Sequence, residues 1–180
     1  MVYPTGCATI DNQIMLDGRL LTGLPSGHVV AIVENPEEQR DFPEHFLSLL
    51  ARNADGPVWW VDLINQYGTS VLENVMITHW HDDKDWDRFV GLIDVVFDKV
   101  RPVIVVLDNA FAFNHCEGVV FNVLGEIQRM CAKHDCLGFF LTYDTGKKNH
   151  WAGDGAVRNF CSYVIDWDQK KIIYSTVMDV

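Results

Sequence analysis

The chain has 180 residues, of which 48% are hydrophobic, so it is long enough for one well-buried core and has a globular composition. Its net charge of −11 excludes a basic protein that coats nucleic acid. No apolar run reaches the roughly 20 residues that a membrane span needs. We therefore expect a single domain over residues 1–180 that makes no membrane contact.

The N-terminus and the cysteines both bear on the cellular compartment. The first residues, MVYPTGCATIDN, lack the basic region and the apolar stretch of a secretory signal. The five cysteines include no CxxC pair and their number is odd, which argues against a disulfide framework or a zinc knuckle. These features predict a cytoplasmic protein with reduced, buried thiols.

Charge is unevenly distributed along the chain. Residues 1–83 carry three basic side chains against twelve acidic ones, a net charge of −9, whereas residues 129–180 carry seven basic against six acidic, a net charge of +1. Because an acidic surface repels a phosphate backbone, any contact with nucleic acid is expected to be local to the C-terminal third.

Short apolar runs rich in β-branched residues predict buried strands. In chain order these runs are His28–Val33, Val58–Leu63, Val75–Thr78, Val103–Asp108, Leu137–Tyr143, Phe160–Asp166 and Lys171–Val177.

Three helices are predicted between these strands. Asp41 with Pro43 and Glu44 supplies the carboxylate cap and first-turn proline of a helix start, and this helix should run to about Asn53. The second helix has one apolar stripe, formed by Trp86, Phe89, Val90, Ile93, Phe97 and Val100. The third has a stripe formed by Val119, Val120, Val123, Leu124, Ile127, Met130 and Cys131.

The alternation of strands and helices predicts an α/β fold with a mostly parallel, twisted sheet and helices on both faces. Trp59 and Trp60 fall on a predicted buried strand and are expected in the core. The segment Gly23–Gly27 is interpreted as a tight lead into the sheet.

Several segments, in order, resemble the core of the RecA recombinase family. TGCATIDNQIMLDGRLLTGLPSGHVVAI is similar to the segment that leads into that family's P-loop strand, and ENVMITHWHDDKDWDRFVGLIDVVFDKVRPVIVVLDNAFAF to its third strand, next helix and Walker B strand. GFFLTYD and GDGAVRNFCSYVIDWD resemble its sensor strand and the segment after its second DNA-binding loop. The resemblance spans about Thr5 to Asp168 and implies a RecA-like three-layer α/β/α sandwich.

The nucleotide site that this resemblance implies is degenerate. Aligned with the P-loop, the chain has Glu34 and Gln39 at glycine positions, Arg40 at the lysine and Asp41 at the hydroxyl that holds magnesium. Ile64 falls at the position of the catalytic glutamate, and Asp108 is a remnant of the Walker B aspartate. We therefore expect no nucleotide cofactor and no ATPase activity.

A second resemblance suggests metal chemistry. ITHWHDDK after an apolar strand is similar to the THxHxDH signature of metallo-β-lactamase-fold hydrolases, in which His79, His81 and Asp83 would bind metal. The last histidine of that signature is Lys84 here, and no segment like the family's later ligands follows. The favoured interpretation is a polar loop that leads to the helix after it, with no metal bound.

The resemblance to RecA also implies a contact with single-stranded DNA after the sensor strand. Here that region reads DTGKKNHWAGDG, in which Lys147 and Lys148 could contact phosphates while His150 and Trp151 could stack on bases. Arg158 lies near a basic position of the family. A solvated loop with a half-buried tryptophan explains the same residues equally well, and two lysines in an acidic protein predict weak binding.

Three functions follow from these interpretations. The favoured one is a catalytically inactive RecA-like protein that acts as an interaction module in DNA recombination, repair or replication, with a RecA-like subunit or itself as partner; a phage is one source compatible with it. The second is an inhibitor of a protein outside DNA metabolism, as the cell-division inhibitor SulA resembles a RecA core without a P-loop. The third is the metallohydrolase.

Overall fold

A computed structural model describes residues 1–34, 49, 52–63, 72–80, 86–110, 117–147, 150–151 and 154–177. Side chains are described at these positions except 117–120, 144–147, 150–151, 154 and 156. In this part of the chain no helix is long and apolar enough to cross a membrane.

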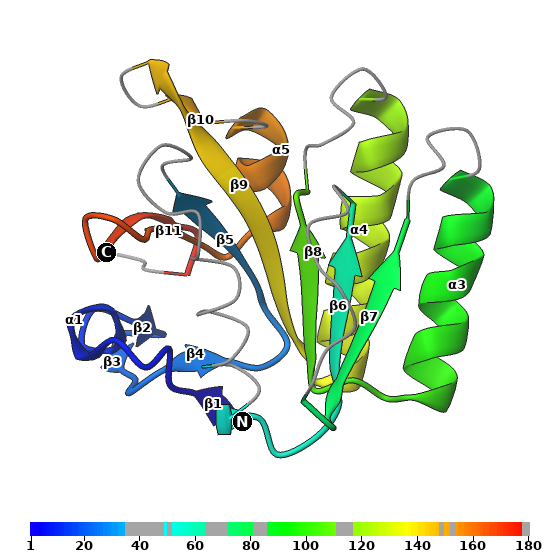
Figure 1. Cartoon of the computed structure of the whole chain (residues 1–180). Helices are drawn as coiled ribbons and strands as arrows, with labels where there is room; N and C mark the ends of the chain where they lie inside the picture. Colours follow the sequence, from blue (N-terminus) through cyan, green and yellow to red (C-terminus); the bar gives the residue numbers. More distant parts are fainter. Residues whose placement is uncertain are drawn as a thin grey trace.

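The centre of the molecule is a mostly parallel sheet in the strand order β12-β11-β5-β9-β8-β6-β7 (Figure 1). Its strands are β5 (Val29–Glu34), β6 (Val58–Asp62), β7 (Val75–His79), β8 (Ile104–Asp108), β9 (Leu137–Lys147), β11 (Tyr163–Asp166) and β12 (Lys171–Ser175). Neighbouring strands are parallel from β11 to β7, whereas β12 pairs antiparallel with β11 and the short β10 (His150–Trp151) pairs antiparallel with β9. The prediction of an α/β fold with a mostly parallel sheet is confirmed.

Three helices pack against one face of the sheet: α3 (Trp86–Lys99), α4 (Glu117–His134) and α5 (Asp154–Phe160) (Figure 1). The inward stripes of α3 and α4 bury their apolar side chains with those of the strands in one cluster. Trp59 belongs to this cluster, is fully buried, and lies against the rings of Phe89 and Phe97. The two predicted amphipathic helices are therefore confirmed.

Among the described residues, the opposite face is covered mainly by the N-terminal segment. This segment contains β1 (Val2–Tyr3), α1 (Ala8–Asp11), β2 (Met15–Leu16), β3 (Arg19–Leu20) and β4 (Leu24–Pro25). Its Ile10, Ile14 and Leu24 are fully buried in a second cluster together with Trp60 of β6. Leu49, which is helical, lies beside Gly6 on this side, while the predicted helix start at Asp41 lies outside the described residues. The predicted helices on one face are confirmed, and on the other face residues 49 and 52–53 of the predicted helix are helical.

Two predicted strands are wrong at one end. Phe160 is the last residue of α5, and strand β11 begins only at Tyr163, because the backbone N–H of Cys161 still bonds to the carbonyl of Val157 in a helical turn. The strand predicted over Leu137–Tyr143 continues to Lys147, because β10 returns along it as a hairpin. The other strands begin and end within two residues of their predicted bounds.

Candidate functional site at the carboxyl ends of the strands

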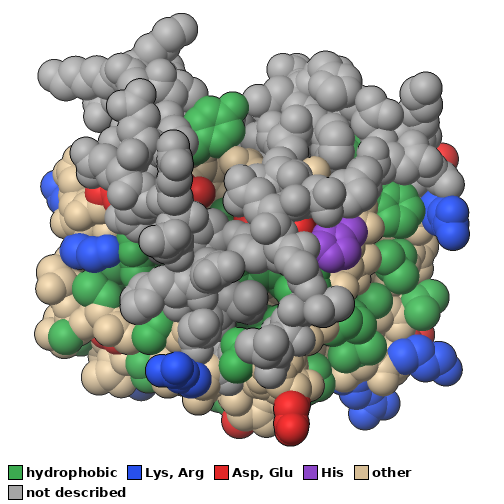
Figure 2. Space-filling model, viewed as in Figure 1, with side chains coloured by type: hydrophobic (Ala, Val, Ile, Leu, Met, Phe, Trp, Pro, Cys, Tyr) green, Lys and Arg blue, Asp and Glu red, His purple; other side chains and the backbone are tan. Residues whose placement is uncertain are grey.

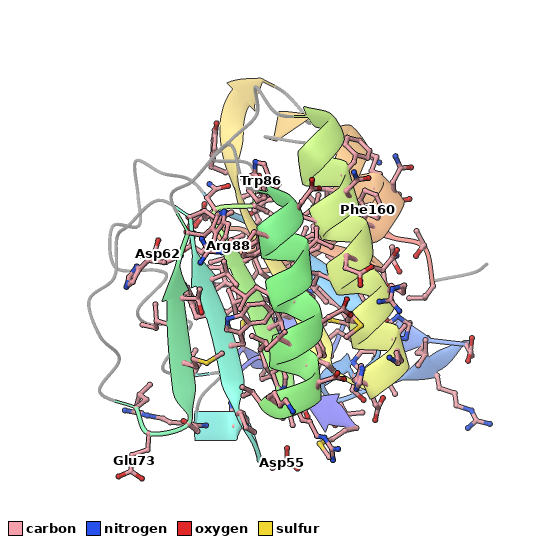
Figure 3. The ribbon with its side chains drawn as sticks, turned by 90° about the vertical axis from the view of Figure 1, so that its right-hand side faces the viewer. Asp55, Asp62, Glu73, Trp86, Arg88 and Phe160 are labelled. Carbon is pink, nitrogen blue, oxygen red and sulfur yellow. The ribbon has the colours of Figure 1, made fainter. Side chains whose placement is uncertain are left out.

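Polar side chains end four of the parallel strands at the same edge of the sheet. Glu34, Asp62, His79 and Asp108 are the last residues of β5, β6, β7 and β8. The crevice beyond the carboxyl ends of parallel strands is where open α/β sheets bind ligands. Figure 3 shows Asp62, Trp86 and Arg88 at this edge, whereas Asp55 and Glu73, which precede β6 and β7, lie at the other end.

Asp62 and His79 form a close pair on adjacent strands. The two residues face each other in the register of β6 and β7, and Nδ1 of His79 lies 3.2 Å from Oδ2 of Asp62. The Asp62 side chain is fully buried, whereas that of His79 is 35% exposed. A buried carboxylate needs a hydrogen-bonded or charged partner, which assigns the Nδ1 proton to this contact.

Glu34 ends the strand that the P-loop would follow in a RecA-like core. Burial in the first place, and then the nearby charges of Asp108 and Asp168, raise the pKa of Glu34 to about 8. Within the described part of the chain, its Oε2 atom is buried and makes no hydrogen bond. Glu34 is therefore mostly protonated at neutral pH, and a group that brings further negative charge here is disfavoured.

Asp108 occupies the strand end that was predicted for the Walker B remnant. Its side chain is 2% exposed, and its register partner on β6 is Asp62. The peptide bond to Asn109 is cis, and the backbone N–H of Leu63, just after β6, bonds to the carbonyl of Asp108. Two buried aspartates thus lie side by side on neighbouring strands.

Other predicted site residues are not tested by the structure. Gln39, Arg40 and Asp41 of the degenerate P-loop and Ile64 lie outside the described residues, as do His81, Asp83 and Lys84 of the metal-like motif. Among the residues that are described, no group of three or more His, Cys, Asp or Glu is arranged to hold a metal ion. His79 is the member of that motif that the structure places, and it pairs with Asp62.

The predicted DNA-contacting loop is a β-hairpin. Lys147 at the end of β9 is the register partner of His150, and Trp151 is the partner of Asp144. The hairpin extends past the carboxyl edge of the sheet (Figure 1). Lys148 lies outside the described residues. Arg158 is held elsewhere, with its guanidinium 4.9 Å from the centre of the Tyr174 ring, so the structure groups three of the five predicted residues in one hairpin.

Three of the four described strand-end side chains, Glu34, Asp62 and Asp108, carry carboxyl groups. In the face that Figure 2 shows, Lys and Arg side chains lie toward the periphery, while the histidine side chain lies with acidic atoms near the middle. The charge around the described part of the site therefore favours cations or neutral hydrogen-bonding groups over phosphates.

Sequence reasoning missed Asp62 as a member of the site. The signal was present in VWWVD, where a carboxylate directly follows four apolar residues of a buried parallel strand. An aspartate at that position reaches the edge where ligands bind, as Asp108 does one strand away.

No protein-family model matches this chain, and no curated protein matches it.

Proposed function

We propose that this chain is a RecA-like core that has lost nucleotide chemistry and acts as an interaction module in DNA recombination, repair or replication. The proposal rests on the ordered resemblance of its segments to the RecA core and on the buried carboxyl at the end of β5. The mostly parallel α/β sheet is compatible with it.

The observation that carries the loss of nucleotide chemistry is the group formed by Glu34, Asp108 and Asp168. Burial and the two aspartates already raise the pKa of Glu34 to about 8, so this edge resists one more negative charge. A carboxylate about 4 Å from a phosphate oxygen costs on the order of a few kcal/mol at an intermediate dielectric. The Glu37, Glu38 and Asp41 side chains that follow in sequence add to that repulsion, and Arg40 alone does not offset it.

Calorimetry with Mg-ATP tests this part of the proposal. No binding tighter than millimolar is expected, either for the wild-type chain or for Arg40→Ala. A micromolar dissociation constant that is lost in Arg40→Ala would show a working P-loop and overturn the proposal. Thr9→Ala, on the N-terminal layer at the other face, is a matched control that should leave any such binding unchanged.

The partner is proposed to be a RecA-like subunit or a second copy of this chain. RecA-like cores dock one subunit against the next with the nucleotide site between them, and a core without nucleotide can keep that docking surface. Light scattering after gel filtration detects self-association. Titration into a purified RecA-family recombinase on single-stranded DNA, with its ATPase rate as the readout, detects the other partner. Monomers that leave the recombinase unchanged would instead favour an inhibitor of a protein outside DNA metabolism.

One observation favours the metallohydrolase as a second candidate. A metal-binding histidine commonly donates its other ring nitrogen to a carboxylate, and His79 has Asp62 on Nδ1. Elemental analysis of protein purified without an affinity tag decides between the two. Substoichiometric zinc, iron and manganese are expected for the interaction module, whereas one or two tightly held ions per chain, abolished by His79→Ala, would support the hydrolase.

A further inference from the structure

Helix α4 ends in a turn that brings two cysteines together. Asp135, directly after the helix, has a positive φ of 54°, and the backbone N–H of Cys136 bonds to the carbonyl of Cys131 at 3.0 Å. This is the six-residue closure of a Schellman motif, in which the first and last residues face each other and their side chains come into contact. The geometry of the turn thus sets Cys131 opposite Cys136.

Both thiols lie in the same apolar cluster. Cys131 and Cys136 are fully buried and share the cluster on the helical face of the sheet. Gly138 leaves room for the Cys131 sulfur, because a Cβ at Gly138 would lie 3.0 Å from it. Burial, followed by a hydrogen bond with the Cys131 thiol, raises the pKa of Cys136 well above its ordinary value. The closure of the turn and the shared apolar cluster thus place the two thiols in one buried environment at the end of α4.

We propose that Cys131 and Cys136 are a redox-sensitive dithiol, which hydrogen peroxide converts to a disulfide within the folded chain. One sulfur attacks the peroxide, the O–O bond breaks and hydroxide leaves, giving a sulfenic acid. The second sulfur then attacks the sulfenic sulfur, the S–O bond breaks and water leaves. In total the two thiols lose two electrons and two protons, and the peroxide becomes two molecules of water.

The disulfide would fasten the last turn of α4 to the start of β9. Disulfides require Cα atoms about 4.4–6.8 Å apart. The 3.0 Å bond from the Cys136 backbone N–H to the Cys131 carbonyl holds the backbones of the two residues close together. Since both thiols are buried, peroxide reaches them when the last turn of α4 opens. That turn contains a non-glycine residue, Asp135, in the left-handed region, where glycine is favoured. Because the turn must open first, oxidation of Cys131 and Cys136 should be slower than oxidation of the partly exposed Cys7.

Peptide mapping of the folded protein tests the proposal. The protein is treated with hydrogen peroxide, its remaining thiols are alkylated in denaturant, and it is digested with trypsin. Because trypsin cleaves after Lys133, Cys131 and Cys136 end in different peptides unless a disulfide joins them. The expected product is this linked pair, lighter than the two free peptides by two hydrogen atoms and restored by a reductant. The oxidised protein should also have a Tm a few degrees higher, because the bridge constrains the unfolded chain.

Two variants control the experiment. Cys136→Ala should abolish both the linked peptides and the rise in Tm, whereas Cys161→Ala, which removes another thiol of the same cluster, should preserve both. Should Cys136→Ala fail to fold, the wild-type peptide map alone decides. The proposal is overturned if peroxide that oxidises Cys7 produces no linked pair in the folded protein, or if the pair appears only when denaturant is present during oxidation.

Discussion

Nδ1 of His79 lies 3.2 Å from Oδ2 of Asp62, and this contact joins a partly exposed imidazole to a fully buried carboxylate across the last register position of β6 and β7. The pair supplies the buried charge with a partner at the edge where the other strand-end carboxylates gather. Its strength can be measured directly.

His79→Ala is expected to lower the free energy of unfolding by about 1–3 kcal/mol, because Asp62 loses a partner inside the protein. Adding Asp62→Asn to His79→Ala should recover part of that loss, because the carboxylate that has lost its histidine partner is then removed. A double-mutant cycle from urea unfolding at pH 7 should give a coupling of about 0.5–3 kcal/mol. Asp87→Asn, on the exposed side of α3, is the control. Strictly additive effects would show that the contact does not contribute to stability.

Stability should fall with rising pH through the titration of Glu34. Its folded-state pKa is raised to about 8, so between the ordinary glutamate range and about pH 8 the folded chain holds a proton that the unfolded chain has released. The unfolding free energy contributed by this group is therefore highest in acid and is lost as pH rises toward 8.

Urea unfolding at pH 6 and pH 9 measures this dependence. Glu34→Gln keeps the shape of the protonated side chain and should reduce the loss of stability between the two pH values. The exposed Glu73→Gln should not. An identical pH dependence in wild type and Glu34→Gln would show that Glu34 ionises normally in the folded protein.

Two glycines should respond oppositely to alanine. A Cβ at Gly23 would lie 2.5 Å from the carbonyl oxygen of Tyr3, in a close backbone contact within the N-terminal layer. Gly23→Ala is therefore expected to destabilise the protein by about 1–3 kcal/mol. Gly91, within α3, has open space at its Cβ position, so Gly91→Ala should stabilise by about 0.5–1 kcal/mol. Thermal unfolding compares the two variants, and a neutral Gly23→Ala would mean that the layer shifts easily.

Single-stranded DNA should bind weakly, and through the hairpin. Two phosphate contacts by Lys147 and Lys148 imply a log–log salt slope of about 1.4, and one base stacked on Trp151 adds about 1–3 kcal/mol. Fluorescence anisotropy with a labelled oligonucleotide should therefore show micromolar or weaker binding at low salt that fades near physiological salt.

Lys147→Glu/Lys148→Glu and Trp151→Ala should each abolish that binding. The matched control is Lys99→Glu/Lys133→Glu, which makes the same change of charge in the last turns of α3 and α4. Tight binding that survives the hairpin variants would place the contact elsewhere, and no binding at any salt would favour a partner that is a protein alone.

The candidate site was predictable only in pieces. Asp108 is predictable as a strand end, because an apolar run of strand length precedes it. A similar apolar run precedes Asp62, so the same reasoning could have placed Asp62 at a strand end. The hairpin around Lys147 was expected as a loop, since nothing in DTGKKNHW distinguishes an extended β9 from an open connection. The sequence places Phe160 in a strand, because an aromatic residue just before an apolar run suits either the start of a strand or the end of a helix.

The sequence by itself determined which segments form strands and helices and that the sheet is mostly parallel. Apolar runs indicate buried strands and apolar stripes indicate amphipathic helices, and each pattern can be read from a short stretch of sequence. Only the tertiary structure decided the strand order, the packing of the N-terminal segment on the second face, the contact of Asp62 with His79, and the effect of the Asp108 and Asp168 charges on the pKa of Glu34. These relationships involve residues far apart in the chain. Because several buried strands have similar apolar patterns, the local sequence does not indicate which strand lies next to which. The position of each strand in the sheet depends on how the crossover helices and the N-terminal layer pack against it.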